Sequence, residues 1–126
     1  MKSSIIALTL SFALARPAVA LGNGMSDSDI RAAIGDRTVV LRTTYGSIPL
    51  TYRSDGSVTG DGSGTGLGRF FAPKETGQWW VSESRMCQKF PTWYDGRTFC
   101  FTLQNAGAGK LKWTREDGYS GIAEIR

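Results

Sequence analysis

The side chains that could carry out chemistry in this chain are few, and its two cysteines are the clearest of them. The sequence has 126 residues and no histidine, which excludes Ser-His-Asp and Cys-His catalysis and removes the commonest metal ligand. Cys87 and Cys100 could form a disulfide or remain two buried thiols. If they are bridged, no thiolate nucleophile and no set of zinc ligands is left. We therefore expect no metal site and no cofactor.

A pair of carboxylates is the remaining route to catalysis. Glycoside hydrolases use two acidic side chains, and Glu83 and Asp95 are the two acids of the aromatic-rich stretch 77–101. Both stand beside serine or glycine, a setting typical of exposed strand ends and turns. The sequence thus favours a protein that is not an enzyme. A small carboxylate-based hydrolase acting on envelope glycans is the alternative hypothesis.

A binding surface is predicted on the loop from Phe90 to Arg97. It carries Trp93 and Tyr94 between turn residues, and Lys89 and Arg97 bracket these aromatics with positive charge. Exposed aromatic and arginine side chains on loops serve as anchors in protein and sugar interfaces. We therefore assign Lys89, Trp93, Tyr94 and Arg97 to binding of an envelope protein or a glycan. The competing interpretation is that Trp93 folds back to cover the end of the core.

The loop is expected to join two antiparallel strands. Aromatic and β-branched residues predict three strands in this region: Trp79–Val81, Met86–Phe90 and Thr98–Leu103. Pro91 and the Asp95-Gly96 pair mark the turn between the last two. This pairing brings Cys87 close to Cys100. A bridge closing a segment of 14 residues would stabilise the fold by roughly 3 kcal/mol.

The compartment decides whether the cysteines pair, and the start of the chain indicates export. Residues 1–20 have Lys2 as a charged start, an apolar run from Ile5 to Ala15, and Ala18-Val19-Ala20, which is the anatomy of a cleaved secretory signal peptide. The run is far shorter than the roughly 20 residues of a membrane-spanning helix. We expect a periplasmic or secreted protein, residues 21–126, with no integral membrane segment after signal removal and a disulfide.

The charge of residues 21–126 is small. Of 15 basic residues, Lys2 and Arg16 belong to the signal peptide, which leaves 13 against 11 acidic ones and a net charge of +2. The basic residues are spread along the chain without a cluster, whereas nucleic-acid binding usually needs a basic stripe. We therefore expect no nucleic-acid partner. The length is that of one small domain that benefits from a covalent staple.

The pattern along the chain predicts an all-β fold with one short N-terminal helix. Ser26 to Ile34 carries a capping-box-like start and ends at Gly35, and so short a helix must pack on something, most simply an open end of a β structure. From Thr38 the apolar period changes to two, with turns every 8 to 15 residues. This indicates an antiparallel meander of seven or eight strands, a barrel or a sandwich. Eight residues should face inward: Ile48, Leu50, Tyr52, Trp79, Phe99, Phe101, Leu111 and Trp113.

Short motifs add a resemblance to a known group of proteins. A short helix runs into Thr38-Val39-Val40, and the chain continues with Asp55-Gly56, Gly77-x-Trp79, Cys87-x-x-Phe90, Cys100 and Asp117-Gly118. This sequence resembles small secreted proteins of alphaproteobacteria that are grouped as a domain of unknown function. The resemblance covers most of residues 21–126, and its motifs are short and structural: glycine corners, a buried tryptophan and a cysteine pair. It implies no activity, so the function expected is that of an uncharacterised exported binding or interaction module.

Overall fold

The computed structural model describes residues 24–66 and 73–126. The predicted signal peptide, residues 1–20, lies outside this part of the chain. One α-helix, eight strands and two short 3-10 turns are found in the described residues: α1 (Asp27–Ile34), β1 (Arg37–Thr43), β2 (Gly46–Tyr52), β3 (Ser57–Asp61), η2 (Ser63–Thr65), β4 (Lys74–Ser82), β5 (Arg85–Lys89), η3 (Trp93–Gly96), β6 (Thr98–Asn105), β7 (Lys110–Arg115) and β8 (Ser120–Ile125).

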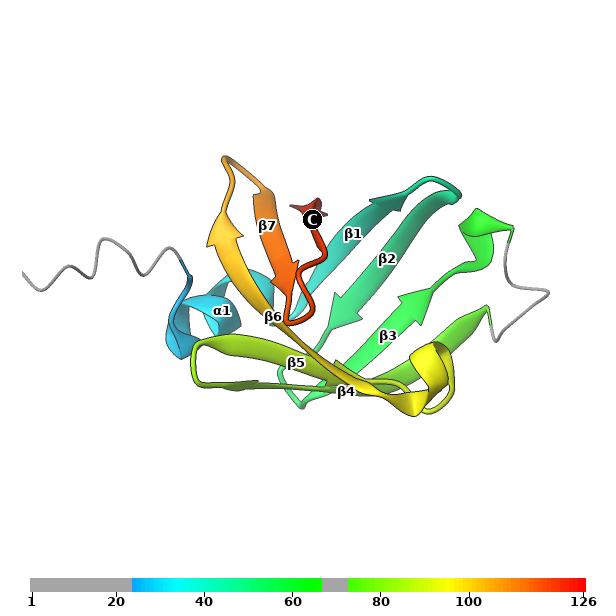
Figure 1. Cartoon of the computed structure of the whole chain (residues 1–126), viewed down its shortest axis with the longest axis horizontal. Coiled ribbons are helices and arrows are strands. Elements are labelled where there is room, and N and C mark those ends of the chain that lie inside the picture. The colour runs from blue at the N-terminus through cyan, green and yellow to red at the C-terminus, as the bar shows by residue number, and fades with distance from the viewer. Residues whose placement is uncertain (1–23, 67–72) are drawn as a thin grey trace, which may run out of the picture.

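The strands form a closed barrel in which each strand pairs antiparallel with its neighbours in sequence (Figure 1). β1 closes the barrel by pairing with β8, where Val39 lies opposite Ile125 and Leu41 opposite Ala123. Closure removes the free sheet edges that a sandwich would leave. Pro49 lies just beyond the ladder between β2 and β3, which begins at Leu50. The prediction of an all-β meander with one helix is confirmed, and the structure is a barrel.

The helix α1 covers one end of the barrel, as the sequence predicted (Figure 1). The hydroxyl of Ser26 accepts a hydrogen bond from the backbone N–H of Asp29 at 3.2 Å, and Gly35 follows the last helical residue. Ile30 and Ile34 are both fully buried in the core. Burial of these two side chains supplies the stability that so short a helix lacks alone.

The interior follows the predicted alternation. All eight residues expected to face inward are buried, pack against the core or line its cavity. In β6, Phe101 points inward and packs on Trp113 with ring centroids 5.8 Å apart, so Cys100 faces outward. Cys87 and Cys100 lie directly opposite each other in β5 and β6 and form a disulfide with Cα atoms 4.0 Å apart. The predicted pairing is confirmed.

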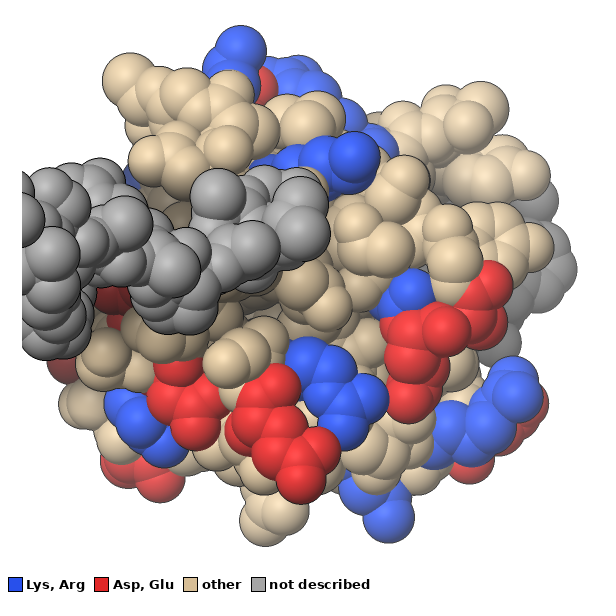
Figure 2. All heavy atoms as spheres, turned by 60° about the vertical axis from the view of Figure 1, so that its left-hand side comes forward, with Lys and Arg blue, Asp and Glu red and all other residues tan. Residues whose placement is uncertain are grey.

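The two ends of the barrel differ. α1 covers the end at which β2 meets β3, β4 meets β5 and β6 meets β7. The connections β1–β2, β5–β6 and β7–β8 therefore lie at the other end, which we call the open end. With the side that carries α1 turned forward, Figure 2 shows acidic and basic side chains mixed, without a stripe of one sign. Across residues 24–66 and 73–126, no helix has the length and apolar content needed to span a bilayer.

Candidate binding site at the open end of the barrel

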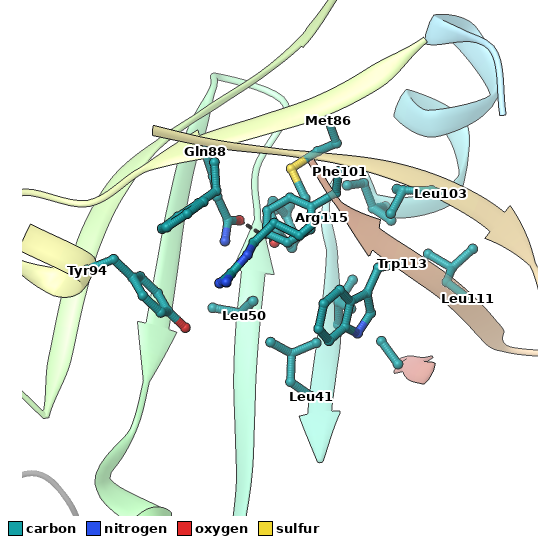
Figure 3. Close-up of a pocket in the computed structure, with 15 residues that line it drawn as sticks. Leu41, Leu50, Met86, Gln88, Tyr94, Phe101, Leu103, Leu111, Trp113 and Arg115 are labelled. Atoms are coloured by element: carbon teal, nitrogen blue, oxygen red, sulfur yellow. Dashed lines mark hydrogen bonds between the residues drawn. The ribbon is translucent and has the colours of Figure 1, made fainter. Parts of the chain in front are cut away.

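A cavity of about 90 Å³ lies inside the barrel. Most of its wall is apolar, and the close-up in Figure 3 shows Leu41, Leu50, Leu103, Leu111 and Trp113 around it. At the helix end the cavity is closed by Ile34, which is fully buried. At the other end its lining includes two partly exposed side chains, Tyr94 of the β5–β6 loop and Arg115 of β7. The cavity therefore reaches the surface at the open end.

Two polar side chains face each other inside this apolar wall. Tyr52 of β2 donates its hydroxyl proton to Gln88 Oε1 of β5 at 2.6 Å. Burial raises the pKa of Tyr52 well above its ordinary value, because the phenolate would lose its hydration. The hydroxyl therefore stays protonated and remains a hydrogen-bond donor to Gln88. The bond fixes the orientation of the Gln88 amide.

The amide nitrogen of Gln88 is consequently directed away from Tyr52 and into the cavity (Figure 3). The residue is only 8% exposed, yet within the described residues Nε2 donates no hydrogen bond. Every fully buried side-chain nitrogen or oxygen in those residues has a hydrogen-bond partner. Because Nε2 has none, it is not fully buried and is accessible from the cavity. Buried amide groups are normally paired. An unpaired donor at this place is one that a ligand can use.

Arg115 of β7 stands where the cavity reaches the surface. Its guanidinium carbon lies 4.5 Å from the ring centre of Phe99 and 4.7 Å from that of Tyr119, distances typical of cation–π contacts. It also donates two hydrogen bonds to Asp117, at 2.7 Å and 2.6 Å. These bonds raise the pKa of Arg115 and lower the pKa of Asp117. The arginine is thus held in place with its charge compensated.

Tyr94 forms the opposite side of the mouth. It lies in η3 with φ 56°, and Asp95 follows with φ 57°, a left-handed conformation that costs roughly 1–2 kcal/mol per residue other than glycine. The Tyr94 ring stands edge-on to Phe99, with centroids 5.4 Å apart, and its hydroxyl points toward the cavity (Figure 3). The strained turn therefore presents an aromatic hydroxyl at the mouth.

The loop that carries Tyr94 is anchored from neighbouring strands. Glu75 of β4 accepts hydrogen bonds from the backbone N–H groups of Thr92 and Trp93 at 3.0 and 2.8 Å. Burial of the Glu75 carboxylate raises its pKa, but the hydrogen bond from the Thr92 hydroxyl and the two backbone N–H bonds outweigh burial, so the pKa of Glu75 is lowered. Trp93 packs on Phe90, with centroids 5.0 Å apart, and its ring lies against the backbone of Gly60. The loop is held before any ligand arrives.

Three exposed tyrosines belong to the connections of the open end. Tyr45 in the β1–β2 turn is 65% exposed, Tyr94 is 50% exposed, and Tyr119 in the β7–β8 turn is 66% exposed. Tyrosine gives a large contact area at a small entropic cost, which is why binding loops use it. Together with Phe99 and Arg115 these residues form what we call the rim of the cavity.

The four residues assigned to binding from the sequence have different positions. Trp93 is 7% exposed and belongs to the core cluster, so the expectation of an exposed stacking ring is wrong. Lys89 is exposed and alternates with the inward-facing Gln88, so it points away from the cavity. Arg97 is exposed and lies 3.9 Å from Asp95. Only Tyr94 reaches the cavity.

The proposed carboxylate pair is not brought together. Glu83 lies in the tight turn before β5, and Asp95 lies in the loop after it. The five residues of β5 span roughly 17 Å, whereas glycosidase carboxylates lie about 5–9.5 Å apart. These two acids cannot act on one bond. Within residues 24–66 and 73–126, no cluster of three potential metal ligands is found.

Gln88 and Arg115 were missed in the sequence, although a signal for both was present. Gln88 follows Met86 by two residues, and Arg115 follows Trp113 by two, so both occupy inward-facing positions of their strands. A polar residue at such a position is an exception that needs an explanation. None of the protein families, curated proteins or solved structures compared with this chain matches it. The family expected from the sequence stays a prediction, and the function must be argued from the geometry.

Proposed function

We propose that this protein is an exported binding module that takes its ligand at the open end of the barrel. The observation that carries the proposal is the Gln88 amide, which is buried, oriented by Tyr52 and has a free donor directed into the cavity. A site with apolar walls and a few fixed polar groups is what small-molecule binding requires. Export is supported by the disulfide, because such bonds persist in oxidising compartments.

The anchored loop supports the same proposal. Glu75 and the buried Trp93 hold η3 in place, so Tyr94 loses little conformational freedom when a ligand binds. The entropic cost of ordering a flexible loop on binding is thereby avoided. The rim tyrosines can contact whatever part of the ligand stays outside the cavity. The envelope protein or glycan expected from the sequence would also meet the protein at this rim.

A fragment screen by NMR on oxidised residues 21–126 tests the proposal. The reporters are the side-chain amide of Gln88 and the indole N–H of Trp113, both of which belong to residues lining the cavity. We expect hits that shift both signals. In Leu41→Trp, a larger ring enters the cavity from its partly exposed wall, and these hits should be lost.

Ile122→Trp is the matched control, because Ile122 is exposed and alternates with the cavity-lining Ala123. It should bind as the unmodified protein does. Hits that shift only rim residues and survive Leu41→Trp would contradict a cavity site and would favour a partner that binds the surface. A complete absence of hits on a correctly folded protein would also count against the proposal.

A further inference from the structure

The chemistry of the cavity narrows the kind of ligand, and this step rests on the proposed function. The groups that reach the cavity mouth are hydrogen-bond donors: the Gln88 amide N–H, the Tyr94 hydroxyl and the guanidinium of Arg115. The acceptor oxygen of Gln88 is already used by Tyr52. A ligand that satisfies these donors must present a hydrogen-bond acceptor.

The charge at the mouth decides between a neutral and an ionised acceptor. Arg115 is bound through two hydrogen bonds to Asp117, and Arg97, another arginine of this end, lies 3.9 Å from Asp95. Lys89 points away from the cavity, because the inward-facing position beside it is Gln88. No uncompensated positive charge in the described residues therefore faces the cavity. An ionised carboxylate would lose its hydration there without gaining a counter-charge.

The size of the cavity limits the apolar part of the ligand. Its volume of about 90 Å³ is smaller than the ~150 Å³ of an engineered cavity that holds benzene. A long acyl chain does not fit, whereas a short branched aliphatic group does. The wall that would surround this group consists of leucine side chains and the Trp113 ring (Figure 3).

We infer that the cavity binds a small neutral molecule that has a carbonyl-type acceptor and a short apolar body. The carbonyl oxygen of the ligand accepts a hydrogen bond from the free side-chain N–H of Gln88, and the apolar body of the ligand lies between Leu41, Leu50 and Trp113. Tyr94 and Arg115 cover the carbonyl at the mouth. Among the described residues, Arg115 is the one cation that lines the cavity, and Asp117 compensates its charge, so the site excludes anions.

Two probes that differ in charge and hardly in shape test this inference: isovaleramide and isovalerate, titrated at neutral pH with the Gln88 and Trp113 signals as readout. We expect isovaleramide to bind in the millimolar range, as its small size allows, and isovalerate to bind at least ~10-fold more weakly. In Asp117→Asn, which leaves Arg115 uncompensated, isovalerate should gain roughly 10-fold, and isovaleramide should change by less than about 3-fold.

The role of Gln88 is tested in a background that leaves no buried hydroxyl unpaired. Tyr52→Phe keeps the Gln88 amide but removes the hydrogen bond that orients it, so isovaleramide should bind this variant more weakly than the unmodified protein, and the variant serves as the reference for the next step. Adding Gln88→Met to that variant removes the donor and should weaken binding by ~3- to 10-fold, the value of one neutral hydrogen bond.

Equal binding of the amide and the acid, or no response of isovalerate to Asp117→Asn, would overturn the inference about charge. Failure of isovaleramide to bind at all would overturn it as well. The proposed function would survive either result if the screen still yields fragments that Leu41→Trp excludes, so the two failures can be told apart.

Discussion

Replacing Gly60 by alanine should displace the tryptophan that holds the Tyr94 loop. A Cβ atom at Gly60 would lie 2.4 Å from Trp93 Cζ3 and 2.7 Å from Trp93 Cη2. Ordinary carbon contacts are about 3.5–4.0 Å, so the ring must move by roughly 1 Å. Trp93 cannot move freely, because Phe90 packs on it with ring centroids 5.0 Å apart. Overpacking of this kind costs about 1–3 kcal/mol.

We therefore expect Gly60→Ala to lower the free energy of unfolding by about 2 kcal/mol, which corresponds to a fall in Tm of roughly 10 °C for a domain of this size. The assay is thermal and urea denaturation of the oxidised protein followed by circular dichroism. Gly64→Ala is the matched control, because its nearest contact would be Ser47 O at an ordinary 3.5 Å. It should stay within about 0.5 kcal/mol of the unmodified protein.

A second comparison identifies the cause. In the Trp93→Phe background the smaller ring leaves room for the new methyl group, so Gly60→Ala should cost at least ~1 kcal/mol less than in the unmodified protein. If Gly60→Ala changes stability by under about 0.5 kcal/mol, Trp93 does not lie against β3, and the account of how the loop is held is wrong. Equal costs in both backgrounds would refute the stated cause.

Three further predictions concern the staple, the buried tyrosine and the loop anchor. Replacing Cys87 and Cys100 by alanine should lower the free energy of unfolding by about 3 kcal/mol, and a reductant that leaves the Tm of the native protein unchanged would contradict this. The raised pKa of Tyr52 means that the folded state holds the hydroxyl proton above pH 10, where the unfolded state loses it. The free energy of unfolding should therefore fall by about 1.4 kcal/mol per pH unit above pH 10. Urea denaturation between pH 9 and 11 measures this slope, and Tyr52→Phe should remove it. Glu75→Gln should speed hydrogen exchange at the backbone amides of Thr92 and Trp93, while the amides of β4 and β5 stay protected. The control Glu124→Gln, which loses only an exposed ion pair with Arg42, should leave exchange at Thr92 and Trp93 unchanged. Unchanged exchange at these amides in Glu75→Gln would mean that the carboxylate does not anchor the loop.

The fold could be predicted because its signals are local. Ser26 and Gly35 mark the two ends of the helix, and the alternation in β2 assigns Leu50 and Tyr52 to the core. The direct pairing of Cys87 with Cys100 follows from the turn between their strands. Each of these inferences depends on residues that are near one another in the sequence.

The site could not be predicted in the same way, because contacts between distant residues determine it. Trp93 is buried because Gly60, on another strand, leaves space for its ring, and the loop is held by Glu75, which lies 17 residues before Thr92. The charge of Arg115 is visible in the sequence, but its position over Phe99 depends on the stagger of β6 and β7. The loop motif therefore indicated a region that contributes Tyr94 to the cavity lining, but it could not indicate that Trp93 is buried and that Lys89 points away from the cavity.

A crystal structure of the oxidised protein with isovaleramide would show where the ligand binds. We expect electron density for the amide inside the barrel, with its carbonyl oxygen within about 3.2 Å of Gln88 Nε2 and its aliphatic group between Leu41 and Trp113. Tyr94 and Arg115 should cover the mouth, with the Arg115–Asp117 pair intact. Density for the probe only on the outer surface, or a barrel whose side chains close the cavity and pair the Gln88 amide internally, would contradict the account.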